Sequence, residues 1–481
     1  MESALNPVFD DSIFPEMIVD HIAQLEKVDQ VPHNDILNNL LDQIEHIDFV
    51  SKAEVEDVSK LTNAHYKILA IENILSVAQR NSWGLCRNQD FIYAFNGCYW
   101  SLIEDGQLRT FLGVASEKMG MKWDKARDAN FRDILYQQFL ETAHFIKPVK
   151  KEGVLIPLLN GTFQINNGLR SLRGFDRNDF ITYQLPFSYD PAAVAPLFQK
   201  YLNEVLPDVK RQLVLAEFMG YLFTTNLKLE KALILYGYGA NGKSVFYEVS
   251  TSLLGINNVS NYSLSSLTNG TGYHRAMLAN KLVNYASEIN GNLEASLFKQ
   301  LVSGEPIEAR LPYGNPMILR DYAKLIFNAN TLPHDVEHST AFFRRFLIVP
   351  FDVTVKPEDQ DVELSKKIIQ AELPGVFNWV LSGLDRILEN KSFTDCDAIR
   401  KQLENYRKQS DSVAMFIEDE NYQKSLTDYV SLKELFQKFK AYCLDSGYRP
   451  CSIKTLSERL RNIGFESEKK NFGAVVYATK F

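Results

Sequence analysis

The sequence lacks several features that would assign it to a special class of protein. No apolar run approaches the roughly 18 residues that a membrane helix needs, so we expect no membrane span. The five cysteines are widely spaced and form no CxxC pair, which predicts reduced thiols and no zinc ribbon. The opening MESALNPVFDD is acidic where a secretory signal is basic and then apolar, so we expect no export and a cytoplasmic location.

Basic charge is also in short supply. Lys and Arg number 52 against 60 Asp and Glu, a net charge of −8, so no basic footprint for nucleic acid covers the whole chain. The charge is uneven, because residues 1–60 hold 14 acidic residues against 3 lysines and residues 449–481 hold 7 basic residues against 3 glutamates. We expect the acidic N-terminal residues not to bind nucleic acid and the basic C-terminal residues to contact phosphates. The alternative is that both are ordinary solvated helix faces, which carry the same kind of charge.

What remains is an ordinary globular composition, with 45% apolar and 23% charged residues in a chain of 481. That length is enough for two to four domains. Helical spacing marks the first 80 residues, as in Ile36, Leu40 and Ile44, and short strands with hairpin turns at Asn96-Gly97 and Asn160-Gly161 follow. We divide the chain into an acidic helical region (1–90), an α+β linker domain (91–205), an α/β core (206–365), a helical connector (366–410) and a C-terminal winged-helix domain (411–481).

The expected elements can be read from apolar segments. Strand-like segments before residue 190 are FIYAFNGCYWSLI, GVLIPLLNGTFQI and FITYQLPFSYD. In the core, strands are predicted at 232–236, 282–287, 324–330 and 345–351, alternating with helices as an α/β fold requires. Further helices are expected at 208–226 and along ELPGVFNWVLSGLDRILEN.

The last 70 residues predict a winged helix. Ser431 and Glu434 form a capping-box pattern at the start of one helix, and a second helix carries Arg459 and Arg461. Short strands around a loop with Lys469 and Lys470 complete the helix, turn, helix and basic wing of a common DNA-binding shape. The alternative is an interaction module with the same fold, because fold alone does not define function.

The most specific feature is a phosphate-binding loop between an apolar strand and a helix. Its sequence GYGANGKS has the P-loop pattern in the context that this motif requires. Glycines turn backbone N–H groups toward a β-phosphate, the lysine reaches the β- and γ-phosphates, and the serine binds Mg²⁺. We therefore predict a site for ATP or another NTP with Mg²⁺, in preference to a structural glycine turn. The expected nucleotide-binding residues are Gly237, Gly239, Ala240, Asn241, Gly242, Lys243, Ser244 and Val245.

Hydrolysis needs further groups at the ends of neighbouring strands. Glu288 follows the strand LVNYAS, where a carboxylate would hold Mg²⁺ or polarise water, and Asn328 and Asn330 end the next strand. Alone, each is also an ordinary strand-end residue, but their order after the P-loop favours a catalytic role. Arg344-Arg345 precedes the following strand and is either surface charge or an arginine finger for the triphosphate of a neighbouring subunit.

At this point the chain resembles the superfamily 3 helicases, AAA+ proteins, and within them the poxvirus D5-like or phage and plasmid P4-type primase-helicases. The resemblance covers roughly residues 90–481. It rests on the segments NGTFQINNG, EFMGYLFT, LYGYGANGKS, KLVNYASE, FKQLVSGEPIEAR, KLIFNANTLP, FFRRFLIVPF and ELPGVFNWVLSGL in this order.

The resemblance implies a role for each matching position. Glu288 would be the Walker B acid, with Ser244 a second metal ligand, Asn330 the sensor amide and Arg345 the finger. Residues 299–317 would include the channel hairpin that grips single-stranded DNA. The residues expected to contact DNA are Lys299, Arg310, Tyr313 and Asn315 there, and Arg459, Arg461, Lys469 and Lys470 in the tail.

Two departures from the family leave questions open. Many related sites carry two adjacent acids, whereas Ile289 and Asn290 follow Glu288, so one carboxylate performs both tasks or another acid such as Glu305 helps. Residues 1–90 are too short for a primase domain. The chain therefore either lacks priming activity or is the helicase portion of a longer protein.

The resemblance implies an ATP-dependent DNA helicase acting as a homo-oligomer, expected to be a hexameric ring that moves 3′ to 5′ on single-stranded DNA at a replication fork. Its setting would be a bacterial cytoplasm or an infected host cell, and a primase would be a further partner. The alternatives are a nucleotide-gated replication initiator or scaffold that binds DNA without unwinding it, and a P-loop NTPase that acts on protein.

Overall fold

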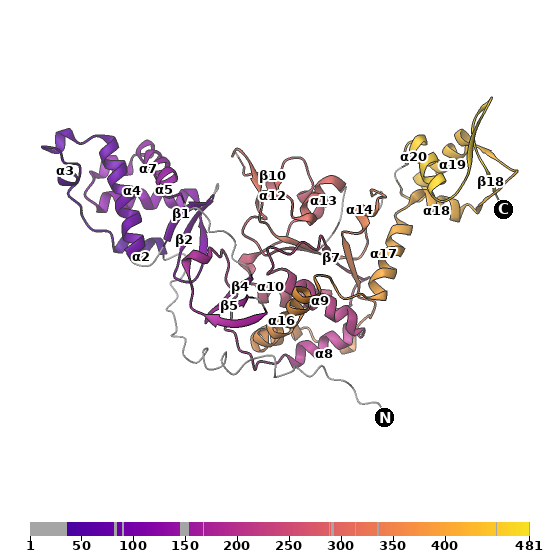
Figure 1. Cartoon of the computed structure of the whole chain (residues 1–481), viewed down its shortest axis with the longest axis horizontal. Coiled ribbons are helices and arrows are strands. Elements are labelled where there is room, and N and C mark those ends of the chain that lie inside the picture. The colour runs from indigo at the N-terminus through magenta and orange to yellow at the C-terminus, as the bar shows by residue number, and fades with distance from the viewer. Residues whose placement is uncertain are drawn as a thin grey trace. The chain divides into compact units, whose positions relative to one another are not determined.

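The computed structural model describes most of the chain, and its contacts divide it into two compact units (Figure 1). The first comprises Met1–Ala195, Ser250–Asn258 and Ile369–Asn378, and the second comprises Pro196–Val249, Val259–Ile368 and Trp379–Phe481. The structure describes residues 36–80, 84–88, 91–144, 153–166, 168–287, 289, 293–312, 314–333, 336–448 and 450–480.

The first unit combines a helical layer with two small antiparallel sheets, of order β1-β2-β3 and β4-β5-β6. Both predicted hairpins are confirmed, since Asn96-Gly97 lies between β2 and β3 and Asn160 lies between β4 and β5. The elements are α2 (Ile36–Asp42), α3 (Phe49–Lys52), η3 (Val58–Lys60), α4 (Asn63–Arg80), β1 (Gly84–Asn88), β2 (Phe91–Phe95), β3 (Trp100–Ile103), α5 (Asp105–Lys118), α6 (Trp123–Arg127), α7 (Ala129–Thr142), β4 (Val154–Leu158), β5 (Gly161–Asn166), β6 (Leu169–Arg173), η4 (Arg177–Asp179) and η5 (Ile256–Asn258).

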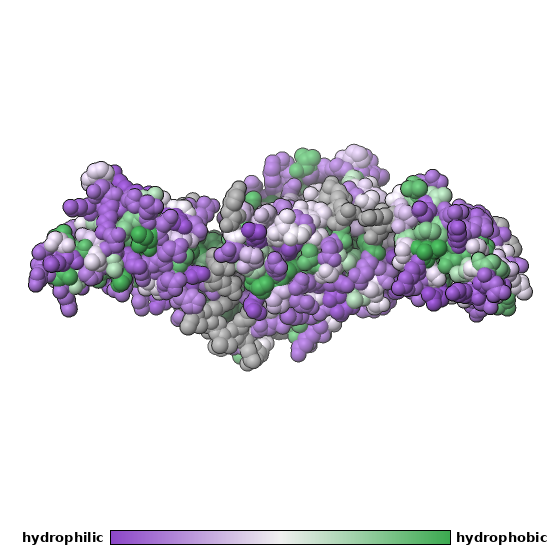
Figure 2. Space-filling model, turned by 90° about the horizontal axis from the view of Figure 1, so that it is seen from above, coloured by the Kyte–Doolittle hydropathy of each residue, from purple (hydrophilic) through white to green (hydrophobic). Residues whose placement is uncertain are grey.

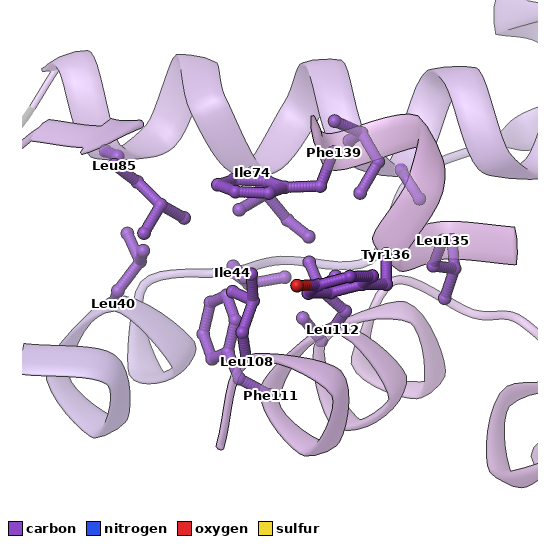
Figure 3. Close-up of a cluster of buried hydrophobic side chains, with 14 of the residues drawn as sticks. Leu40, Ile44, Ile74, Leu85, Leu108, Phe111, Leu112, Leu135, Tyr136 and Phe139 are labelled. Atoms are coloured by element: carbon purple, nitrogen blue, oxygen red, sulfur yellow. The ribbon is translucent and has the colours of Figure 1, made fainter. Parts of the chain in front are cut away.

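An apolar cluster holds the helical layer together. Figure 3 shows side chains from α2, α4, α5, α7 and β1 converging, among them Leu40, Ile74, Leu108 and Phe139. Ile74, Leu108 and Phe139 have no exposed surface. Burial of this kind stabilises by roughly 1.5–3 kcal/mol for each large side chain.

The strand predicted through FITYQLPFSYD is wrong. Residues 180–190 form no strand and instead bond at single points to β3, β4 and the β4–β5 turn: Ile181 O accepts from Trp100 N, Leu185 N donates to Pro157 O, and Tyr189 N donates to Asn160 Oδ1. Pro186 has no N–H and cannot take part in a regular ladder. The third strand of that sheet is β6 instead.

The second unit is built on a parallel sheet of five strands in the order β13-β7-β12-β9-β8. The predicted core strands are confirmed as β7 (Ala232–Tyr236), β9 (Val283–Ala286), β12 (Lys324–Ala329) and β13 (Phe346–Pro350), and they are almost entirely buried, as continuous apolar runs in parallel sheets usually are. The remaining elements up to residue 410 are α8 (Pro196–Val205), α9 (Val209–Tyr221), α10 (Lys243–Leu254), β8 (Val259–Ser260), α11 (Leu264–Leu267), α12 (Tyr273–Ala276), α13 (Ala295–Ser303), β10 (Ile307–Arg310), β11 (Pro316–Leu319), α14 (Thr340–Phe343), η6 (Pro357–Asp359), α15 (Leu364–Ala371), α16 (Leu373–Asn390) and α17 (Asp397–Gln409).

Two glycines allow α9 and α16 to approach each other closely. A Cβ on Gly220 would lie 2.6 Å from the Leu384 Cα, and one on Gly383 would lie 2.2 Å from the Ala216 O. Beside this crossing, the buried Glu217 carboxylate accepts from Arg386 Nε at 3.0 Å. The helix pair therefore has a fixed contact point that tolerates no added atoms.

The C-terminal part contains the helix, helix and hairpin that the sequence predicts. Its core includes Phe416, Leu435, Phe439, Leu456 and Leu460. The capping-box prediction is wrong in one respect: Ser431 is the N-cap residue, but its side chain makes no cap hydrogen bond, and its backbone pairs with Val475 in a sheet. The elements are α18 (Ser412–Asp419), β14 (Tyr422–Lys424), β15 (Val430–Ser431), α19 (Leu432–Asp445), α20 (Ile453–Asn462), β16 (Ser467–Lys470), β17 (Gly473–Val476) and β18 (Ala478–Lys480).

The visible surface in Figure 2 is mainly hydrophilic, with hydrophobic residues in scattered patches. None of the helices in the described ranges combines the length and the apolar run that crossing a bilayer requires.

Candidate nucleotide and DNA sites

The P-loop connects the carboxyl end of β7 to the first turn of α10. Gly239, Ala240 and Gly242 have φ values of 111°, 45° and 82°, in the left-handed region that glycine adopts without strain. Glycine is also required by space, because a Cβ on Gly242 would lie 2.7 Å from Val205 Cγ1 and one on Gly237 would lie 2.3 Å from the Phe351 O.

The loop is braced without any ligand. The Tyr201 hydroxyl donates to the Gly242 O at 2.8 Å, and Asn241 Nδ2 donates to the Phe351 O at 3.1 Å. Val355 N also donates to the Ala240 O at 2.7 Å. The segment after β13 thus fixes the P-loop from one side and α8 fixes it from the other, so little ordering remains to oppose binding of a phosphate.

Lys243 lies at the centre of this site. Its Nζ donates to the Gly237 O at 2.6 Å, to Asn241 Oδ1 at 3.1 Å and to Asn330 Oδ1 at 3.3 Å. These three neutral oxygens use all the donors of the ammonium group. Desolvation lowers the pKa of Lys243, whose side chain is buried among them. A triphosphate would offer the same three donors charged oxygens, which are stronger acceptors.

The strand order brings the second group to the P-loop. Because β12 lies between β7 and β9, its end carries Asn330 to Lys243, 87 positions away in sequence (330 − 243). Asn328 has a different task, since it is buried and its Oδ1 accepts from the Tyr285 hydroxyl at 3.1 Å. The structure thus gives the two amides different partners, and Asn330, which the family resemblance named as the sensor, is the one on Lys243.

Glu288 lies outside the described residues. The strand that leads to it, β9, ends at Ala286 next to β12, so the chain reaches the same edge of the sheet as the P-loop. Ser244 is exposed at the start of α10, and its neighbour Val245 is half-buried there. No group of three metal-ligating side chains occurs in the described part of the chain. A Mg²⁺ ion would be held by Ser244, Glu288 and the nucleotide's own phosphates.

The arginine pair lies at the amino ends of the parallel strands, whereas the P-loop lies at their carboxyl ends. In the register of β13 and β7, Phe346 is level with Ala232 and Pro350 with Tyr236. Arg345 is therefore level with Lys231, the residue before β7, six residues from the first glycine of the P-loop, or about 20 Å along the strand.

The two arginines differ in their surroundings. The Arg345 side chain is 9% exposed and donates to Ser303 Oγ at 2.8 Å and to the Ala341 O at 2.5 Å. The Arg344 side chain is 54% exposed and forms an ion pair with Glu230 at 2.5 Å. The finger role remains a prediction for Arg345, and Arg344 is the more exposed member of the pair.

The predicted channel segment forms a two-stranded hairpin, β10 paired with β11. Arg310 and Asn315 are exposed, and Arg310 Nε donates to the Gly314 O at 2.9 Å within the hairpin; Tyr313 lies outside the described residues. Lys299 on α13 is engaged with Glu337 at 2.8 Å. This ion pair and the Ser303 hydroxyl on Arg345 join α13, the helix before the hairpin, to the segment that carries the arginines.

The basic residues predicted in the tail have separate positions. Arg461 is exposed on α20, whereas Arg459 lies 3.6 Å from the Asp411 carboxylate. Lys469 is exposed on the wing, and Lys470 Nζ lies 3.7 Å from the centre of the Tyr429 ring.

Some contributors to the site were not found in the sequence. Tyr201 and Phe351 brace the P-loop, and Ser303 holds Arg345, yet the sequence assigned no role to any of these three residues. Their contacts arise only when the strands assemble, so no spacing pattern in the chain signals them.

A P-loop on a five-stranded parallel sheet, with an amide from the adjacent strand on its lysine, defines a protein of the P-loop α/β class. Comparison with protein families then matches the chain to the D5 N terminal like family over residues 74–207 and to the Poxvirus D5 protein-like family over residues 408–480. Between them, residues 235–345 match a family of unknown function, DUF5906. Two parts of the chain thus match D5-like families, and its resemblance to the D5-like superfamily 3 helicases is confirmed.

No curated protein matches the chain. Among solved structures, the A-form apo structure of the NrS-1 C-terminal region is 13% identical, covers 84% of this chain and 98% of its own, and has a TM-score of 0.47. A second apo structure of that region, spanning its residues 305–718, is 12% identical, covers 86% and 99%, and has a TM-score of 0.44.

Proposed function

We propose that this protein is an ATP-dependent DNA helicase that works as a ring, expected to be a hexamer moving 3′ to 5′ on single-stranded DNA. The observation that carries the proposal is the meeting of Lys243 and Asn330 at one edge of the parallel sheet. The family matches support it, because D5-like helicases are NTP hydrolases.

In the proposed mechanism, the P-loop N–H groups and Lys243 bind the β- and γ-phosphates of ATP. The Asn330 amide already accepts a hydrogen bond from Lys243. Loss of the γ-phosphate would therefore change the hydrogen-bond partners of this amide. Mg²⁺ held by Ser244 and Glu288 would neutralise charge that develops during phosphoryl transfer. The described groups thus bind the triphosphate and respond to its cleavage.

A second subunit is part of the mechanism. Arg344 and Arg345 lie about 20 Å along the strand from their own P-loop, so they are poorly placed to serve their own nucleotide. An arginine from this pair would instead enter the site of the neighbouring subunit and stabilise charge on the triphosphate. This arrangement supports an oligomer in which each site lies between two chains.

DNA would lie against the β10–β11 hairpin and the C-terminal domain. Arg310 and Asn315 are exposed on the hairpin, and Arg461 and Lys469 are exposed in the tail. A ring that binds DNA inside needs positive charge only along its channel, which is compatible with a net charge of −8.

The proposal is tested by measuring ATP hydrolysis with and without single-stranded DNA, together with displacement of a labelled strand from substrates with a 3′ or a 5′ tail. We expect DNA to stimulate hydrolysis and displacement to require ATP and one tail polarity. ATP-dependent assembly on DNA without displacement would instead identify a nucleotide-gated initiator or scaffold. Hydrolysis indifferent to DNA would favour an NTPase that acts on protein.

A further inference from the structure

The tip of the C-terminal wing carries exposed aromatic rings beside lysines. Phe472 lies in the two-residue turn between β16 and β17 and is 69% exposed, and Tyr429, which precedes β15, is 45% exposed. Their rings are stacked, with centroids 6.3 Å apart and planes at 30°. Exposed apolar groups that lie together mark an interaction site, whereas single exposed ones are ordinary.

A third ring and two lysines complete this group. Tyr477 packs edge-on against Tyr429 at 6.1 Å, and Lys470 Nζ lies 3.7 Å from the centre of the Tyr429 ring and 5.5 Å from that of Tyr477. Lys469 is exposed at the preceding position of β16. We call Tyr429, Phe472 and Tyr477, with Lys469 and Lys470, the wing-tip cluster.

The charges around the cluster favour an anionic ligand with flat groups. Two carboxylates, Glu466 and Glu468, lie near Tyr477, and Glu468 is already engaged, accepting from the Tyr477 hydroxyl at 2.6 Å. That hydrogen bond is the main reason that the pKa of Tyr477 is raised, so this ring stays neutral. The Lys470 ammonium group has the faces of Tyr429 and Tyr477 as close neighbours.

We infer that the wing-tip cluster binds unpaired bases of single-stranded DNA by stacking, with Lys469 and Lys470 on the flanking phosphates. Base stacking on aromatic side chains tolerates any sequence, and lysines beside the rings add contacts with the backbone. A paired duplex hides its base faces, so the same cluster would offer a duplex only its charges. The inference deepens the proposed function, because it assigns the C-terminal domain to the single strand.

The test uses the full chain and fluorescence anisotropy with three labelled probes: oligothymidylate, an abasic strand of equal length and a duplex. We expect Phe472→Ala to weaken oligothymidylate binding at least about 5-fold, the effect of losing one stacked base, while abasic and duplex binding stay unchanged. Phe472→Trp should restore affinity, because it restores a ring. Leu444→Ala serves as the matched control, since Leu444 is 73% exposed in the same domain but lies outside the cluster.

Three results would overturn the inference. If Phe472→Ala bound oligothymidylate with unchanged affinity, the cluster would not bind bases and would instead serve a protein partner. If the affinity for all three probes fell equally, the loss would reflect general charge or a folding defect and not base stacking. A change in oligomeric state by analytical ultracentrifugation would identify a second copy of the chain as its ligand.

Photocrosslinking of an iododeoxyuridine strand to the wing peptide separates this inference from the helicase proposal. The crosslink requires only bound bases and no hydrolysis. A protein that crosslinks at the wing but never displaces a strand would retain the wing site and lose the helicase function, and the reverse outcome would retain the helicase alone.

Discussion

Lys243 is positioned for a triphosphate before one arrives, because three neutral oxygens hold its ammonium group beside the P-loop. We expect Lys243→Ala to reduce hydrolysis at least about 100-fold, the usual effect of removing one preorganised electrostatic contact. Steady-state phosphate release measures the loss, and a thermal melt tests the fold. Hydrolysis at the wild-type rate would place the catalytic nucleotide elsewhere.

The arginine pair gives a second test at this scale, because the two side chains differ in burial. We expect both Arg344→Ala and Arg345→Ala to retain nucleotide binding, and the variant that lacks the finger to lose about 1000-fold in turnover. Arg345→Ala should also lower the free energy of unfolding by about 1–3 kcal/mol, because it removes a buried partner of Ser303. Nucleotide affinity, turnover and urea unfolding of both variants assign the two roles.

At the scale of elements, α13 connects the arginine segment to the hairpin through the Lys299–Glu337 and Ser303–Arg345 contacts. We expect Glu337→Gln to keep hydrolysis without DNA and the fold, since a half-exposed ion pair contributes only about 0–1 kcal/mol. Stimulation of hydrolysis by single-stranded DNA should fall. The affinity for DNA should stay equal or rise, because Lys299 is no longer paired with a carboxylate.

The matched control for that coupling is Glu363→Gln, which breaks an exposed ion pair with Lys366 on α15. If both variants respond to DNA as the wild type does, α13 has no coupling role. Stimulated hydrolysis and DNA affinity are measured on the same preparations.

The crossing of α9 and α16 offers a stability test that is independent of catalysis. A methyl group at Gly383 would overlap the Ala216 backbone, so Gly383→Ala should cost about 1–3 kcal/mol of unfolding free energy. Urea denaturation measures this cost. Gly270→Ala is the control, because a Cβ there meets no atom within 4 Å and its φ is not positive.

The elements also show what sequence alone could predict. Strands such as 232–236 and 324–329 were predictable because buried parallel strands are continuous apolar runs, and the P-loop was predictable because one short segment holds all of its parts. The strand proposed at 180–190 failed because an apolar, aromatic segment can also lie against a sheet through isolated hydrogen bonds.

The contacts of the site were beyond prediction for a related reason. The pairing of Asn330 with Lys243 depends on β12 lying between β7 and β9, and strand order is not encoded by any local pattern. The burial of Arg345, as opposed to Arg344, depends in the same way on Ser303 from a distant helix.

At the scale of the whole molecule, a site shared between subunits predicts complementation. Lys243→Ala and the inactive arginine variant should each be inactive alone, yet mixing them should restore part of the activity. Some interfaces in a mixed ring would join an intact P-loop from one protein to an intact arginine from the other. Phosphate release across a titration of mixing ratios measures the recovery. A flat, inactive titration with confirmed subunit exchange would mean that each chain supplies all of its own catalytic groups.

Strand β13 connects the segment that braces the P-loop to the arginine pair. The segment at its carboxyl end braces the P-loop through the Phe351 O and Val355 N, and the arginine pair precedes its amino end. Every residue of this short strand is buried, and a close-packed interior transmits strain, so a shift at one end displaces the other. Each protomer would then pass the state of its own nucleotide to the next protomer as a mechanical signal. Hydrolysis would proceed from one subunit of the ring to the next in a fixed order instead of at random.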